Sequence, residues 1–103
     1  MKKSYYHPED LKKFEKINEW NEVVGSKFFD YYNSVFEEGS LSAREKSLIA
    51  LAVSHVIQCP YCIDSYTKDG LQRGIEKEEM IEAVHVGAAI KAGAALVHVV
   101  QMM

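Results

Sequence analysis

The chain has 103 residues, of which 48% are hydrophobic and 26% charged, and its formal net charge is −3. This length and composition predict one folded domain over residues 1–103 with a modest core. The small negative charge excludes the basic surface that nucleic-acid binding needs. The first residues lack the apolar stretch of a signal peptide, and the most apolar segment, Val84 to Val100, is interrupted by a lysine and two histidines. We therefore expect a cytoplasmic protein that binds neither a membrane nor nucleic acid.

The first third of the chain predicts two helices. No stretch of the whole sequence alternates cleanly between apolar and polar residues, so the pattern favours an all-α fold of about six helices. Pro8 and the acids behind it fit the start of the first helix, and Gly25 is expected to break it. A second helix is expected from Ser26 to Glu38, ended by Gly39. The aromatic residues from Phe28 to Phe36 are expected in the core.

The middle of the chain predicts a buried central helix followed by a fourth helix. Ser42 and Glu45 have the spacing of a capping box, and the apolar residues that follow surround most of the cylinder, which predicts burial. This helix must end near Cys59, because a residue before proline disfavours the α conformation. Pro60 suits the first position of the fourth helix, which runs to about Arg73.

The C-terminal part predicts a fifth helix from Lys77 to about Lys91. The last segment, from Ala92 to Met103, is either a sixth helix or a continuation of the fifth. Glycine and alanine are frequent around this join. Small residues permit close approach between helices, within one chain or between chains.

The only two cysteines, Cys59 and Cys62, are three positions apart in a Cys-Pro-Tyr-Cys motif. In a cytoplasmic chain such a pair is typical of redox or metal chemistry rather than of a structural disulfide. We expect Cys59 at the N-cap and Cys62 in the first turn of the fourth helix, where free backbone N–H groups and the helix dipole favour a thiolate. A thiolate attacks a peroxide or a disulfide, and the second cysteine then resolves the product. Position alone does not decide which sulfur attacks.

Two other interpretations of the pair are a metal site and two inert buried thiols. A structural zinc ion needs four ligands, so this chain would have to add two histidines or a second subunit. His55, four residues before Cys59, and His85, on a later helix, are natural helpers of the sulfurs; the ordinary alternative is a histidine with a satisfied hydrogen bond. Asp64 would oppose a thiolate if it pointed at the sulfurs. No glycine-rich phosphate loop is present, which predicts no organic cofactor, and we predict no bound metal.

Three segments of the chain together resemble the carboxymuconolactone decarboxylase family and, more narrowly, its alkylhydroperoxidase D (AhpD)-like members. They are residues 44–53, the Cys59–Cys62 motif and residues 74–83, and the likeness extends over about residues 41–103. The resemblance implies an AhpD-like helical bundle that assembles as a trimer or hexamer. It also implies a thiol peroxidase in which Cys62 becomes the sulfenic acid and Cys59 resolves it. The decarboxylase branch generally lacks the CxxC pair, so the cysteines argue against lactone decarboxylation.

At two positions this chain differs from the active peroxidases of the family that it resembles. Those enzymes carry a histidine four residues after the second cysteine, where this chain has Tyr66, and a glutamate twelve residues before the first, where it has Ser47. Both halves of the usual proton relay are therefore missing. Tyr66 can form a hydrogen bond with a thiol but is a weak base near neutral pH, so we name His55 or His85 as a hypothetical replacement.

A narrower resemblance is to the peroxidase-like proteins associated with arsenosugar biosynthesis. It is carried by residues 59–67, 82–86 and 96–102. Trivalent arsenic is soft and prefers paired thiolates, as other soft ions do. Our functional prediction is a thiol-dependent peroxidase or disulfide oxidoreductase, with a small peroxide or disulfide as substrate and a redox protein as electron donor. The alternatives are a dithiol module that binds a metal or metalloid without turnover, and an inactive structural oligomer.

Overall fold

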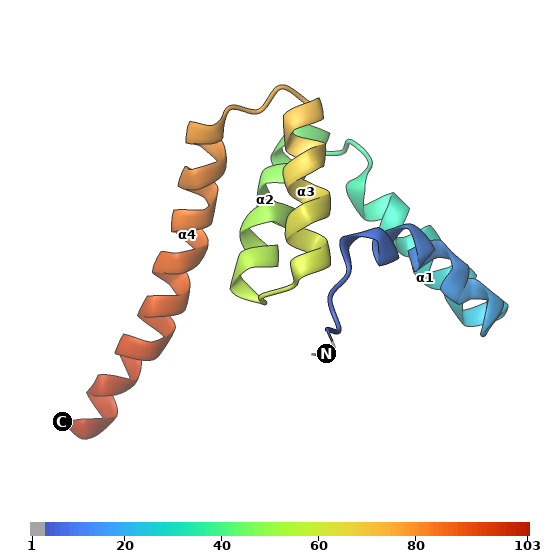
Figure 1. The fold of residues 1–103 in the computed structure, drawn as a ribbon. Helices are drawn as coiled ribbons and strands as arrows, with labels where there is room; N and C mark the ends of the chain where they lie inside the picture. Colours follow the sequence, from blue (N-terminus) through green and yellow to red (C-terminus); the bar gives the residue numbers. More distant parts are fainter. Residues whose placement is uncertain (1–3) are drawn as a thin grey trace. The chain divides into compact units, whose positions relative to one another are not determined.

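The computed structural model describes residues 4–103, and all regular structure in that range is helical (Figure 1). The prediction of an all-α fold is confirmed, since no strand occurs in these residues. Two compact units make up the chain: the first ends at Ala43, and the second runs from Arg44 to Met103.

The first unit contains the 3-10 helix η1 (Pro8–Glu19) and the helix α1 (Glu22–Phe36). The predicted break at Gly25 is wrong, because the chain leaves the first helix earlier. Asn21 is the N-cap of α1, and its side chain accepts a hydrogen bond from the Val24 N–H at 3.2 Å. Asparagine at this position satisfies a backbone donor that the helix itself leaves free, so the new helix begins before the glycine.

The contact between η1 and α1 explains why Gly25 lies inside a helix. A Cβ atom at this position would lie 2.0 Å from Asn18 Oδ1, so any other residue here would force the Asn18 side chain to move. Phe14 of η1 stacks edge-on against aromatic rings of α1, with its ring centroid 4.9 Å from that of Phe29. The expectation that the aromatic residues form a buried core is therefore wrong: they pack against one another, but Phe28 is 41% and Tyr31 70% exposed, and no residue of η1 or α1 is fully buried.

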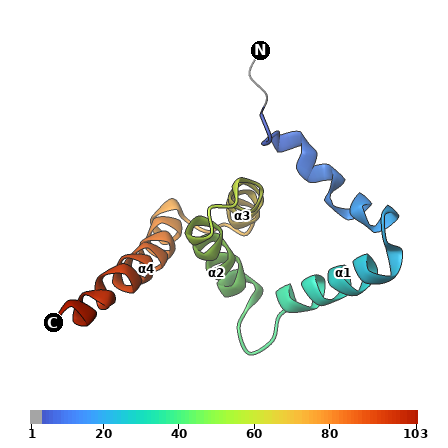
Figure 2. The same cartoon turned by 90° about the horizontal axis from the view of Figure 1, so that it is seen from below.

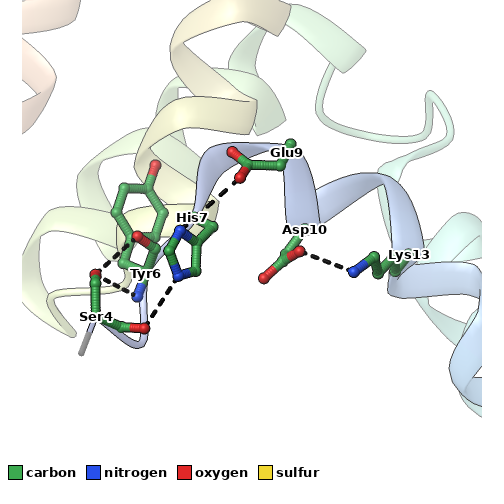
Figure 3. Close-up of polar contacts among 6 residues, drawn as sticks. All are labelled: Ser4, Tyr6, His7, Glu9, Asp10 and Lys13. Carbon is green, nitrogen blue, oxygen red and sulfur yellow. Dashed lines mark hydrogen bonds and ion pairs between the residues drawn. The ribbon is translucent and has the colours of Figure 1, made fainter. Parts of the chain in front are cut away.

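A short turn precedes η1 (Figure 3). Ser4 Oγ donates to the Tyr6 carbonyl at 3.1 Å and accepts from the Tyr6 N–H at 3.2 Å, while the Ser4 carbonyl accepts from His7 Nε2 at 3.1 Å. Two further contacts reach into the first turns of the helix: His7 Nδ1 lies 3.8 Å from Glu9 Oε1, and Lys13 forms an ion pair with Asp10 at 3.0 Å. All of these contacts are exposed and local, and they fix only the start of η1.

The second unit contains the helices α2 (Ala43–Val56), α3 (Pro60–Gln72) and α4 (Lys77–Leu96), and the 3-10 helix η2 (Val97–Met102). The predicted starts of α2, α3 and α4 agree with these bounds. The expected end near residue 91 is wrong: α4 runs on and passes directly into η2, so the alternative of a continuation is confirmed. The described part of the chain therefore has five helical bodies, and the CxxC pair lies at the start of the fourth.

Helix α2 lies between α3 and α4 (Figures 1 and 2). Arg44 at its start forms an ion pair with Glu79 at the start of α4, and the Val56 carbonyl at its end accepts from Lys91 Nζ at 3.3 Å, so α2 and α4 run parallel. Gly87 makes their close approach possible, since a Cβ there would lie 2.9 Å from a methyl group of Val56. The hydrogen bond from Arg44 lowers the pKa of the Glu79 carboxyl.

The core of the second unit is small. It consists of Leu51, Ile75 and Met80, against which Tyr66 and other half-buried residues pack. The prediction of a buried central helix, with apolar residues around most of its cylinder, is wrong in part for the single chain. One face of α2 remains open, where three apolar side chains are half exposed or more: Ile49, Val53 and Ile57. This face is open because α3 and α4 pack against the other sides of α2.

Together, α4 and η2 make a helix of 26 residues that is long and apolar enough to cross a membrane by length and composition. The sequence-based expectation that no segment has these two properties is therefore wrong, because one lysine and two histidines do not offset the surrounding valine, leucine and alanine. Only 6% of its most apolar stretch is buried in the single chain. That the protein binds no membrane stays a prediction.

Candidate redox site

The two cysteines meet at the corner between α2 and α3. Cys59 and Cys62 form a disulfide, and their Cα atoms are 5.2 Å apart. This separation lies in the ordinary range for disulfides, about 4.4–6.8 Å. Both sulfurs therefore reach each other while α3 keeps its first turn intact, as the two-residue gap predicts.

The backbone before Cys59 is fixed by the end of α2. Two hydrogen bonds close this end: the Gln58 N–H donates to the His55 carbonyl at 3.2 Å, and the Cys59 N–H donates to the Ser54 carbonyl at 3.1 Å. Between them Gln58 takes the left-handed conformation, with φ of 57°. This is the Schellman arrangement, in which glycine is the usual residue at the left-handed position. The corner thus places Cys59 at the cost of a strained glutamine.

Cys59 is the N-cap of α3, which confirms the position expected for it. Its Sγ atom accepts a hydrogen bond from the Cys62 N–H at 3.3 Å, and its carbonyl accepts from the Ile63 N–H at 2.9 Å. Cys62 lies in the first turn. The sulfur of Cys59 consequently sits at the positive end of the α3 dipole, with a main-chain donor directed at it.

Asp64, the acid nearest in sequence to the pair, is held by a cation. Its carboxylate forms an ion pair with Lys68 Nζ at 3.1 Å, one turn further along α3. The side chain is thus engaged in the direction of the helix C-terminus. The negative charge that would oppose a thiolate is partly balanced.

The three candidate helper residues lie on three different helices. His55 is in the last turn of α2, where Nδ1 donates to the Leu51 carbonyl at 2.8 Å, so that Nε2 of the neutral ring keeps a free lone pair. Tyr66 is half buried on α3, one turn after the second cysteine, and packs against the core. His85 is exposed on α4. None of the histidines in residues 4–103 forms a hydrogen bond with either sulfur.

Ser47, at the position where the resemblance leads one to expect a glutamate, bonds elsewhere. It is only 2% exposed, and its Oγ donates to Asp69 Oδ2 at 2.7 Å, which also accepts from Arg73 Nε at 2.9 Å. Burial by itself raises the pKa of Asp69, but the hydrogen bonds from Arg73 and Ser47 outweigh it, so that pKa lies below its usual value. This triad ties α2 to α3.

Sequence reasoning missed this triad and also missed Lys91. The i,i+4 spacing of Asp69 and Arg73 is a readable signal, but the partner of Asp69 on another helix is 22 residues away. In the sequence, Lys91 stands out only as an interruption of an apolar stretch. In the structure its ammonium group donates a hydrogen bond to the last carbonyl of α2, three residues before the first cysteine. The two residues are 35 positions apart, so no local sequence pattern predicts this contact.

Comparison with known proteins agrees with this architecture. The profile of the carboxymuconolactone decarboxylase family matches residues 23–103, a range that includes both cysteines. A crystal structure of a protein from Methanobacterium thermoautotrophicum, from the Northeast Structural Genomics Consortium, is similar with a TM-score of 0.79 and 33% sequence identity, and covers 82% of this chain and 96% of that chain.

A curated relative is the uncharacterised protein 4 in the cox locus of Paracoccus denitrificans. It is 47% identical over 64 residues, which are 62% of this chain and 58% of that protein. The chain thus spans somewhat more than half the length of this relative.

Proposed function

Since the chain belongs to the carboxymuconolactone decarboxylase family, we propose that it is a thiol-dependent peroxidase or disulfide oxidoreductase that uses the Cys59–Cys62 pair. The observation that carries this proposal is the disulfide at the start of α3. The dithiol releases two electrons when it closes to the disulfide, and the disulfide accepts two when it opens, without rebuilding the helix. The AhpD-like and arsenosugar-associated subgroups stay predictions.

With a peroxide as oxidant, one cysteine thiolate attacks the outer oxygen and becomes a sulfenic acid, while the alcohol or water leaves. The other cysteine then condenses with the sulfenic acid, releasing water and forming the disulfide. The family resemblance assigns the attack to Cys62 and the resolution to Cys59. A dithiol on a redox protein returns the pair to its reduced form by exchange.

His55 is the better supported of the two proposed bases. It lies in the turn that leads into Cys59, and its Nδ1–H bond to the Leu51 carbonyl holds the ring so that Nε2 can accept a proton. His85 is exposed on α4 and has no contact that directs it to the pair. Tyr66 is proposed to orient the thiol of Cys62 rather than to remove its proton.

The exposed apolar residues of the second unit support our proposal that the protein is a homo-oligomer. A trimer or hexamer, and a location in the cytoplasm, stay predictions. Val86, Ile90 and Leu96 on α4 are each about two-thirds exposed, and the outer face of α2 is also apolar. Exposed apolar residues of this number are typical of a protein interface when they form one patch. Light scattering without detergent should give a multiple of the chain mass, and a monomer, or a protein found only in membranes, would contradict the proposal.

The functional test is peroxide consumption with dithiothreitol as reductant. We expect turnover by the wild-type protein, and none by Cys59→Ser or Cys62→Ser, because a single thiol cannot close the cycle. His55→Ala should slow thiol oxidation, while His98→Ala, a matched change of an exposed histidine bonded to Gln101, should leave it unchanged. Equal rates for both cysteine variants and the wild type would contradict the proposed function.

The alternative is a dithiol module that binds a metal or metalloid through the two sulfurs of Cys59 and Cys62. In residues 4–103, no group of three or more histidine, cysteine, aspartate or glutamate side chains is placed to hold a metal ion. Stoichiometric binding of a thiophilic ion together with no peroxide consumption would establish it. Cysteines that resist every thiol reagent would instead favour an inactive oligomer.

A further inference from the structure

We propose that Cys59, and not Cys62, is the sulfur that attacks disulfide substrates. This assignment rests on the proposed redox function of the pair and reverses, for disulfide exchange, the order of roles that the family resemblance implies for peroxide. The substrate class is a disulfide on another protein or a small molecule. Three features of the corner between α2 and α3 carry the assignment.

The first feature is the main-chain donor at Cys59. Its Sγ is the N-cap acceptor of α3 and receives the Cys62 N–H at 3.3 Å. In the reduced protein this N–H faces a sulfur that can carry a full negative charge, and hydrogen bonds to charged acceptors are stronger than those to neutral ones. The dipole of the thirteen-residue helix acts in the same direction. Cys62 donates this bond and receives no such donor from the described residues.

The second feature is that neither Ser47 nor Tyr66 can act as a base for Cys62; the proposed base, His55, lies in the turn that leads into Cys59. Ser47 is buried and donates its proton to Asp69, and Tyr66, one turn after Cys62 on α3, packs against the core of the unit. Neither side chain is a base near neutral pH. The thiolate that forms most readily is therefore the one that the backbone stabilises.

The third feature is the charge and access around Cys59. The residues on both sides of it, Gln58 and Pro60, are exposed, so a disulfide on another molecule can approach along the corner. The carboxylate of Asp64 is paired with Lys68, and Lys91 places an ammonium group at the end of α2. The ammonium group of Lys91, which forms no ion pair among the described residues, favours a thiolate at this corner.

The reaction balances in two exchanges. The Cys59 thiolate attacks one sulfur of the substrate disulfide, a Cys59–substrate disulfide forms, and the other substrate sulfur leaves as a thiolate that takes a proton from water. Cys62 then loses its proton and attacks Cys59 Sγ, which forms the intramolecular disulfide and releases the second substrate thiol. The substrate gains two electrons and two protons, and the dithiol loses both.

The test compares Cys62→Ser, which keeps Cys59, with Cys59→Ser, which keeps Cys62. The probe is 5,5′-dithiobis(2-nitrobenzoate), whose released thiolate is coloured. The donor to Cys59 is a main-chain N–H, so it persists in Cys62→Ser, and serine can still cap α3 in Cys59→Ser. At neutral pH we expect Cys62→Ser to react about tenfold faster or more, with a difference that shrinks as the pH rises and both thiols ionise. In concentrated urea the two variants should react at equal rates.

A Cys59→Ser variant that reacts as fast as Cys62→Ser, or faster, in the folded state would overturn the assignment. A rate difference that persists in urea would also overturn it, because the difference would then not come from the fold. The proposed function is judged separately, in the wild-type protein. If wild type cycles between dithiol and disulfide but Cys62 is the faster thiol, only the assignment fails; if it does not cycle, the proposed function fails.

Discussion

The substitution Gln58→Gly tests the corner that positions Cys59. Gln58 has φ of 57°, a left-handed conformation that costs an L-residue about 1–2 kcal/mol and costs glycine nothing. Glycine also makes the unfolded chain more flexible, which offsets about 0.5–1 kcal/mol of this gain. We therefore expect Gln58→Gly to raise the free energy of unfolding by about 0.5–1 kcal/mol.

The measurement is urea unfolding of the reduced protein, followed by circular dichroism at one fixed protein concentration. With a slope of about 1 kcal/mol per molar urea, the midpoint should rise by about 0.5–1 M. Gln58→Ala is the matched control, because alanine keeps the Cβ atom and should give no such rise. Gly74→Ala provides the opposite sign, since Gly74 has φ of 76° and alanine there should lower stability by about 1 kcal/mol. If Gln58→Gly is no more stable than Gln58→Ala, the left-handed conformation described for Gln58 would be contradicted.

Three further predictions concern the packing of the second unit. Ser47→Ala should lower stability by about 1–2 kcal/mol in urea unfolding, because it removes a buried hydrogen bond to a carboxylate; a change below a few tenths would contradict the triad. The pKa of Asp69 is lowered in the folded state, so its ionised carboxylate stabilises the fold above the usual carboxyl pKa, and this stabilisation is lost as the pH falls from about 5 through the folded-state pKa. Asp69→Asn should therefore be less stable than wild type at neutral pH. The difference in unfolding free energy between the two proteins should become smaller in acid. Gly87→Ala should lower the free energy of unfolding by about 1–3 kcal/mol, because the new methyl group would lie 2.9 Å from Val56. Gly93→Ala, where a Cβ atom has no neighbour within 4 Å, should be neutral or slightly stabilising in thermal melts. Equal effects of the two substitutions would refute the close approach of α2 and α4.

The parts of the fold that follow from local chemistry were predictable. Proline at the start of α3, the residue before it and the acids at the start of α4 mark helix ends through effects that act over a few residues. The N-cap position of Cys59 follows from the same rules, as does the ability of the two sulfurs to bond. These features needed no knowledge of which helices touch.

The sequence-based predictions fail where contacts between helices determine the local structure. Gly25 looks like a helix breaker, but in the structure it is the residue that lets the side chain of Asn18 fit against α1. The burial of α2 depends on which faces its neighbours cover, and periodicity alone does not say this. The left-handed Gln58 has no sequence signal, since a glutamine at that position is uncommon.

The candidate site was predictable in its sulfurs but not in its surroundings. The spacing of the cysteines is local, while the partner of Ser47 lies on another helix and depends on how α2 packs against α3. The same holds for Lys91, which reaches the end of α2 from α4. Of the proposed helpers, His55 is near the pair because it directly precedes the corner in sequence.

The central claim is that Cys59 and Cys62 form a redox couple. Mass spectrometry of the reduced protein, before and after one equivalent of hydrogen peroxide, tests it most directly. The account predicts the loss of two hydrogen atoms per chain, localised to the peptide that holds both cysteines and reversed by dithiothreitol. Thiols that stay reduced, or that gain oxygen without forming the disulfide, would contradict it.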